Sequence, residues 1–223
     1  MTDHGLTVRV RKLAREGGAA LVGFADVEGL AALPRAVVIA MRISRAALAD
    51  PDNMPNKAYA DEYDALNERL TSLAQALADL LVRHGHEARA HPATGMDFDR
   101  ETLAAPFSHK MAATRAGVGW IGKSALLVTP EFGPAVRLAS VLTDAPLAVG
   151  EPITESGCGD CTACVDACPG GAIKGELWYA GRPREEIYDA FACLRTAQAR
   201  AHAIGIEHSI CGVCMAACPR RPR

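Results

Sequence analysis

The chain has 223 residues, of which 49% are hydrophobic, and a formal net charge of −2. This length fits one medium domain with a smaller one, and the apolar content is sufficient for a buried core. No apolar run reaches the roughly 18 residues that a membrane-spanning helix needs. The slightly acidic balance argues against general nucleic-acid binding, which favours a basic face, so nucleic acid is not an expected partner.

The first quarter of the chain predicts one helix and two strands. Residues 6–16 place apolar side chains at helical spacing, and Gly17 and Gly18 then end the helix. Residues 19–25 and 36–43 are short apolar runs with β-branched side chains, which is typical of buried strands.

The longest predicted helix covers residues 58–83, after a proline-containing loop at 46–56. Its apolar side chains recur at steps of three and four, so they form one stripe that should pack on a sheet. The stripe consists of Tyr59, Tyr63, Leu66, Leu70, Leu73, Leu77 and Leu80. Gly85 ends this helix, and residues 87–91 predict another strand.

A polar loop and a short helix follow. Residues 97–107 predict a loop over a cavity, in which Asp97 and Asp99 supply carboxylates. Ser108 is a suitable N-cap, because its hydroxyl can accept from the free backbone N–H groups of a helix over 108–116.

The glycine-dense segment 117–123 leads into two apolar runs, residues 125–129 and 135–142, which a turn joins. We expect these runs to form a β-hairpin. Residues 146–157 form a linker into the last third of the chain, where residues 184–200 predict a helix.

All eight cysteines lie in this last third. The first four follow the pattern C-x2-C-x2-C-x3-C-P, one stands alone, and the last three follow C-x2-C-x3-C-P. They are Cys158, Cys161, Cys164, Cys168, Cys193, Cys211, Cys214 and Cys218. Eight thiolates make two sets of four, the number that a [4Fe–4S] cluster needs, so we expect two such clusters.

The ligands can be sorted from the spacing. In runs of this kind the fourth cysteine ligates the other cluster, and the proline after it restricts the backbone. We therefore assign Cys158, Cys161, Cys164 and Cys218 to the first cluster. The second cluster takes Cys168, Cys193, Cys211 and Cys214.

Three other uses of these cysteines fit the pattern less well. Disulfides occur in secreted chains, but residues 1–15 are polar and charged where a signal peptide is apolar. Zinc usually takes paired C-x2-C knuckles, and isolated structural thiols would not be so regularly spaced. The clusters imply a reducing cytoplasm, and no twin-arginine signal precedes an apolar segment.

Residues 116–144 (AGVGWIGKSALLVTPEFGPAVRLASVLTD), followed by the eight cysteines, resemble the epoxyqueuosine reductase family. The shared features are a G-W-I-G-K-[NS] block, a P-E-[FY]-G turn, an L-T-D ending and the order of the cysteines. Members of this family are cobalamin-dependent, two-cluster enzymes of tRNA modification, and they are related in fold to reductive dehalogenases.

The resemblance implies an α+β protein. A nitroreductase-like α/β domain at residues 1–150 would precede a two-[4Fe–4S] ferredoxin-like domain at residues 151–223. It also implies a corrinoid, cobalamin in the family, close to one cluster, and an external low-potential electron donor of the ferredoxin or flavodoxin type.

Two features depart from the family. Its proton-donating Asp lies in a D-[ST]-x-P segment, and alignment on Pro106 places Leu103 at that position. A basic residue that follows in the family corresponds to Lys110. The sequence also ends just after the last cysteine, without the C-terminal helical-repeat region that many members carry.

The candidate catalytic residues are His109 and Lys110. His109 could replace the missing proton donor, because histidine titrates near neutrality. The candidate cofactor-binding residues are Lys110, Gly117, Gly119, Trp120 and Gly122. These glycines match G-x-G-x-x-G, but they follow no clear strand of a βαβ unit, so we favour a corrinoid-facing or cluster-facing role over a dinucleotide site.

These features together predict an iron–sulfur oxidoreductase that passes electrons through two [4Fe–4S] clusters to a corrinoid and an unknown substrate. The alternative is a two-cluster electron-transfer protein, or a corrinoid-reducing relay, without catalysis of its own. The missing carboxylate favours the alternative, whereas the intact upper domain favours the enzyme.

Overall fold

A computed structural model describes residues 2–94 and 98–221, and the chain divides into two compact units. The first unit consists of Met1–Arg42, Ala65–Gly119 and Arg137–Ile153. The second consists of Ile43–Asp64, Trp120–Val136 and Thr154–Arg223. The division at residue 150 follows chain order, whereas spatial contacts also join residues 43–64 and 120–136 to the cysteine-bearing segment.

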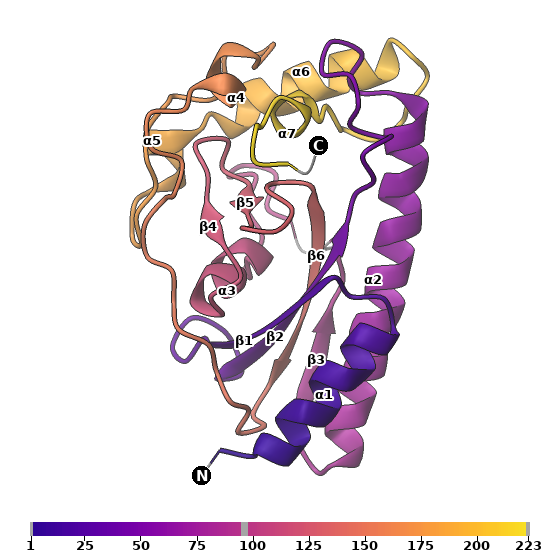
Figure 1. The fold of residues 1–223 in the computed structure, drawn as a ribbon, viewed down its shortest axis with the longest axis vertical. Coiled ribbons are helices and arrows are strands. Elements are labelled where there is room, and N and C mark those ends of the chain that lie inside the picture. The colour runs from indigo at the N-terminus through magenta and orange to yellow at the C-terminus, as the bar shows by residue number, and fades with distance from the viewer. Residues whose placement is uncertain (1, 95–97, 222–223) are drawn as a thin grey trace. The chain divides into compact units, whose positions relative to one another are not determined.

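The chain contains both helices and strands, and after β6 it continues through helices α4 to α7 (Figure 1). The helices are α1 (His4–Glu16), α2 (Lys57–Arg83), α3 (His109–Arg115), α4 (Ala163–Asp166), α5 (Arg184–Ile187), α6 (Ala190–His202) and α7 (Val213–Ala216). The strands are β1 (Leu21–Asp26), β2 (Arg35–Arg42), β3 (Ala88–His91), β4 (Trp120–Ile121), β5 (Leu127–Val128) and β6 (Val136–Thr143). The mixture confirms the predicted α+β class.

The first unit is built on a four-stranded sheet with the order β1-β2-β6-β3. β1 pairs antiparallel with β2, and β3 pairs antiparallel with β6. In β2, every residue between the two terminal arginines is buried. A continuous apolar strand of this kind requires cover on both faces of the sheet.

Helices provide this cover from opposite sides. A Cβ added to Gly23 of β1 would lie 2.5 Å from Val118, directly after α3. The next residue, Phe24, faces α1, where the Arg11 guanidinium carbon lies 4.8 Å from the ring centroid. Because consecutive strand residues point to opposite faces, α3 and α1 lie on different sides of the sheet. Within the first unit, α2 runs beside α1 (Figure 1).

The apolar stripe of α2 forms much of the core, as predicted, except that Tyr63 is only half-buried and that the stripe ends at a different leucine. Leu70 and Leu77 are fully buried, and Leu66 and Leu73 are nearly so. The last buried position is Leu81 rather than Leu80, because a four-residue step from Leu77 keeps the side chain on the same face.

The predicted hairpin of residues 125–129 with 135–142 is wrong. β5 instead pairs with β4, matching Trp120 to Val128, and β6 lies between β2 and β3 in the large sheet. Most of β6 is buried, so it needs hydrogen-bonded neighbours at both edges, which a two-stranded hairpin cannot give. The turn before β6 closes on itself through reciprocal backbone hydrogen bonds of 2.9 Å between Thr129 and Gly133.

The predicted helix over residues 184–200 is broken into α5 and α6. Tyr188 between them is extended, with φ −157° and ψ 133°. The Asp189 carboxylate then accepts from the Ala192 N–H at 2.9 Å and caps α6. A capping carboxylate starts a new helix here, so the segment forms two helices instead of one.

The other predicted helices and strands are confirmed to within a few residues. Ser108 caps α3 by accepting from the Met111 N–H at 3.3 Å. Asp97 lies outside the described residues, and the Asp99 carboxylate is used in a turn, where it accepts from the Glu101 N–H at 2.7 Å. Within residues 2–94 and 98–221, no helix has the length and apolar character needed to cross a membrane.

His109 is held inside the first unit by both ring nitrogens. Nε2 lies 3.0 Å from the Pro92 carbonyl oxygen, and Nδ1 lies 2.9 Å from the Ser140 hydroxyl. Because a carbonyl can only accept, Nε2 carries the proton and Nδ1 accepts from Ser140. Burial lowers the pKa of His109 to about 4, so the imidazole is neutral at neutral pH.

Replacement of His109 by Gln should reduce the fall in the free energy of unfolding between pH 6.5 and pH 4. In the unfolded chain His109 gains a proton near its ordinary pKa of 6.5, whereas in the folded protein it does so only near 4. Stability is therefore lost as the pH falls from 6.5 to 4, by on the order of 3 kcal/mol. Anaerobic urea unfolding across this range measures the slope. His4→Gln, at an exposed site on α1, should leave the slope unchanged.

Candidate iron–sulfur centres

The two cysteine runs fold alike, each as a loop leading into one turn of helix. Cys164 lies in α4 and Cys214 in α7, and these two short helices pack against each other. After each helix the chain turns back, as the N–H of Cys168 donates to Val165 and that of Cys218 to Met215. Cys193 comes from a third element, α6.

Four of the thiols surround one cavity of about 320 Å³. They are Cys158, Cys161 and Cys164 from the first run and Cys218 from the second. The rest of the lining consists of Gly122, Lys123, Ser124, Val128, Pro219 and Arg220. The last cysteine of the second run thus lies with the first three of the other run.

The residues of this cavity fit a [4Fe–4S] cluster. Four thiols are the complete ligand set of a cubane, and they surround a volume without converging on a point. Within the described part of the chain, no three His, Cys, Asp or Glu side chains lie close enough to share a single metal ion. Gly122 keeps its side of the cavity open, because a Cβ there would lie 2.7 Å from Val128 and 3.4 Å from Cys158 Sγ.

The other four thiols form a second group. The pKa of Cys193 is raised by burial and by the nearby thiols of Cys211 and Cys168. The pKa of Cys214 is raised by burial and then by Cys193, Cys211, Cys164 and Cys168. Cys168, Cys193, Cys211 and Cys214 therefore lie within electrostatic reach of one another, and Cys214 also lies within reach of Cys164 of the first set.

The surroundings of Cys164 keep its thiol protonated before iron binds. Burial and the neighbouring Cys158, Cys218 and Cys161 thiols raise the pKa of Cys164 to about 11. An iron ligand must be a thiolate, so iron binding releases this proton, and the positive cluster core stabilises the charge that burial opposes.

Tyr188 is a contact of the second group that the cysteine spacing did not reveal. Its hydroxyl forms a hydrogen bond with Cys193, and burial raises its pKa, so the group stays a neutral donor. The extended conformation of Tyr188 between α5 and α6 makes this contact possible. A hydrogen bond to a ligating sulfur favours the reduced cluster and raises its potential.

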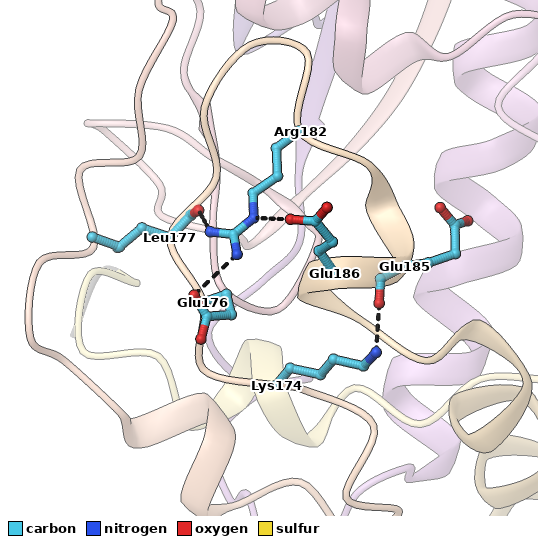
Figure 2. Close-up of polar contacts among 6 residues, drawn as sticks. All are labelled: Lys174, Glu176, Leu177, Arg182, Glu185 and Glu186. Atoms are coloured by element: carbon cyan, nitrogen blue, oxygen red, sulfur yellow. Dashed lines mark hydrogen bonds and ion pairs between the residues drawn. The ribbon is translucent and has the colours of Figure 1, made fainter.

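Figure 2 shows how the segment before Tyr188 is fixed by Arg182. Its guanidinium donates to Glu186 at 3.0 Å, to Glu176 at 3.0 Å and to the Leu177 carbonyl at 2.6 Å. Lys174 closes the base of the loop by donating to the Glu185 carbonyl at 2.6 Å. These contacts hold the residues that lead into α5.

The other predicted site residues fall in both units. Gly117 belongs to the first unit and has φ +71°, where a Cβ would lie 2.6 Å from the Glu151 carbonyl oxygen. Its glycine requirement is therefore explained by packing within the protein. Gly119 is buried, and Lys110 is half-buried on α3, directly after His109.

Trp120 lies beside the cysteine loop in the second unit. It is 8% exposed, the Arg220 guanidinium carbon is 5.0 Å from its ring, and a Cβ at Gly157 would come within 3.0 Å of the indole. Among the described residues, its Nε1–H has no hydrogen-bond acceptor. Trp120 therefore packs behind the loop that carries Cys158.

Comparison with known proteins agrees with this site. Residues 157–221, which include all eight cysteines, match the 4Fe-4S double cluster binding domain family. Epoxyqueuosine reductase from Escherichia coli (strain K12) is 34% identical over 140 residues, which are 61% of this chain and 35% of that protein. The Bacillus anthracis enzyme is 46% identical over 66 residues, 30% of this chain and 17% of that protein. The chain thus spans about a third or less of these relatives.

Solved structures extend the likeness to the whole fold. A catabolic reductive dehalogenase in complex with 3-bromo-4-hydroxybenzoic acid matches 96% of this chain and 31% of that chain, with a TM-score of 0.73 and 21% identity. An epoxyqueuosine reductase with a tRNA stem loop matches 97% of this chain and 65% of that chain, with a TM-score of 0.62 and 21% identity.

The fold and the cysteine sets define an iron–sulfur protein with a double [4Fe–4S] domain, so the predicted clusters are confirmed. More particularly, the chain is a relative of the epoxyqueuosine reductases and shares the fold of those enzymes and of reductive dehalogenases. The resemblance noted in the sequence is thereby confirmed.

Cys193→Ala should remove the second cluster and spare the first. The structure groups Cys193 with Cys168, Cys211 and Cys214 and places it outside the lining of the first cavity. Iron content of the anaerobic protein should fall from about eight to about four atoms per chain, with one EPR signal retained.

The matched control is Cys161→Ala, at the first cavity, which should remove the other signal. Two unchanged EPR signals in the Cys193→Ala protein would show that the ligands are sorted wrongly.

Proposed function

We propose that the protein is a corrinoid-linked iron–sulfur reductase, which passes electrons from an external low-potential donor through its two clusters to a corrinoid and a substrate. The observation that carries the proposal is the likeness over nearly the whole chain, not only over the cluster domain. One such neighbour matches 96% of this chain with a TM-score of 0.72, and it is a reductive dehalogenase whose structure suggests a mechanism for B12-dependent dehalogenation. An electron carrier alone would need only the cysteine-bearing residues.

When bound, a corrinoid supplies a strongly reducing cobalt, and the protein supplies position and electrons. Lys110 is our candidate for contact with a corrinoid side chain or an anionic substrate, because it carries an ammonium group on α3. His109 fixes the start of this helix through Pro92 and Ser140. Gly117, Gly119, Trp120 and Gly122 remain candidates for the cofactor-facing segment.

A relay without its own catalysis is the second candidate, and the state of His109 favours it. Both ring nitrogens are engaged, and the low pKa leaves no proton to donate at neutral pH without breaking the Pro92 hydrogen bond. Leu103 likewise offers no proton where the related family has a carboxylate.

Binding of cob(II)alamin to the anaerobic protein tests the corrinoid directly. We expect the cobalt EPR spectrum to change to a base-off form at saturating cofactor, and Lys110→Gln to weaken the binding. Lys12→Gln is the matched control, because Lys12 is exposed on α1 and pairs with Glu16 of the same helix. An unchanged cobalt spectrum would leave the two-cluster relay as the function.

Leu103→Asp separates the enzyme from the relay. Leu103 has φ +53°, a conformation that Asp and Asn adopt more easily than Leu, so the backbone should accept the change. With corrinoid and reductant present, we expect the variant to reduce an epoxyqueuosine-containing stem loop faster than the wild type. Leu103→Asn has the same backbone tolerance without a proton and should show no gain. Equal rates for all three proteins would favour the relay or a different substrate.

A further inference from the structure

Lys123 is a largely buried residue of the first cysteine cavity. Its residue is only 6% exposed, and it lines the same volume as the thiols of Cys158, Cys161, Cys164 and Cys218. A buried lysine is unusual, because removal of an ammonium group from water is unfavourable unless an opposite charge or several acceptors replace the water.

The turn between β4 and β5 holds Lys123 in place. The N–H of Gly122 donates to Leu126 at 2.9 Å, and that of Ala125 donates back to Gly122 at 2.9 Å. The same turn approaches the ligand loop closely, since a Cβ at Gly122 would be 3.4 Å from Cys158 Sγ. The hydrogen-bonded backbone of this turn therefore carries residue 123 next to the ligand loop.

The described part of the chain supplies no carboxylate for this cation. The ion pairs found there involve other lysines and arginines, among them Lys12 with Glu16 and Lys57 with Asp61. Arg220, the other cation of the lining, donates to the Gly157 carbonyl at 2.8 Å and stacks on Trp120. Arg220 thus has partners in the protein, whereas none of the ion pairs among the described residues includes Lys123, and an anionic cluster in the cavity would supply an opposite charge.

We propose that Lys123 is the counter-charge of the first cluster and raises its reduction potential. A [4Fe–4S] cluster with four thiolates carries a charge of about −2, and about −3 after it takes up one electron. A fixed positive charge at short range stabilises the more negative state more strongly, above all where water is excluded. Lys123 therefore makes the first cluster easier to reduce.

At the second group of thiols, a hydrogen bond rather than a charge acts on the reduction potential. There the neutral hydroxyl of Tyr188 donates to Cys193, and a hydrogen bond acts on the potential without adding a charge. Each side chain acts on one cluster, so each provides the control for the other. The inference rests on the clusters alone and is independent of the corrinoid, because both potentials can be measured on corrinoid-free protein.

The test is an EPR-monitored redox titration of anaerobic protein with both clusters, using dithionite as the reductant. Lys123→Met keeps the length of the side chain and removes its charge. We expect the equilibrium constant for reduction of the first cluster to fall at least tenfold, a shift of about 59 mV to lower potential. The second cluster should not shift. Lys123→Arg should stay near the wild type, and so should Ser124→Ala, which alters the same lining without a change of charge.

Tyr188→Phe should give the reciprocal result, with a lower potential for the second cluster only. A Lys123→Met protein that fails to assemble the first cluster, while Lys123→Arg assembles it at the wild-type potential, also supports the proposal. Wild-type potentials in a fully loaded Lys123→Met protein would overturn it. Loss of the first cluster from Lys123→Arg as well would overturn it too, since the requirement would then be for shape and not for charge.

Discussion

The exchange of cysteines between the two runs is the constraint on which the second unit depends. Cys218 lies with the first three cysteines of the other run, and Cys168 lies with Cys193, Cys211 and Cys214. Two loops that are far apart in sequence are therefore cross-linked twice when the clusters are bound. The packing of α4 on α7 places the two runs in the orientation that this exchange needs. Because such small helices bury little apolar surface, metal–thiolate bonds supply stability that a core of this size cannot.

The surroundings of several cysteines disfavour the free thiolate, which a bound iron can stabilise. Burial comes first among the causes that raise the pKa values of Cys164, Cys193, Cys214 and Cys218. The same partial burial strengthens interactions with a bound cluster, whether with the ammonium group of Lys123 or the hydroxyl of Tyr188. Small changes in these two side chains can therefore adjust the two potentials separately. An electron-transfer chain with two similar centres needs such a means to give them different potentials.

In the first unit, the described side chains indicate a chemical role less clearly than the cysteines do. Its sheet is covered on both faces, and His109, the histidine adjacent to Lys110, is neutral and fixed by two hydrogen bonds. Leu103 occupies a left-handed conformation that a leucine rarely adopts. Backbone strain of this kind persists where the surrounding turn requires it, and the Asp99 turn provides that frame through the Asp99–Ala104 bridge.

The sequence by itself determined the cofactor and most of the elements. Cysteine spacing is a local property, so C-x2-C-x2-C-x3-C-P was enough to predict clusters, and the period of α2 was enough to predict a buried helix. The partners of β6 could not be predicted, because an apolar run does not specify which strand lies beside it. The break at Tyr188 was not predicted, because the sequence pattern did not separate α5 from α6, and only the folded chain shows that this tyrosine contacts Cys193. In the sequence, Lys123 is one residue of the glycine-dense segment, and nothing there distinguishes it from an exposed lysine. Its role depends on burial beside thiols that lie 35 or more residues further along the chain, and burial is decided by tertiary packing rather than by neighbours in sequence.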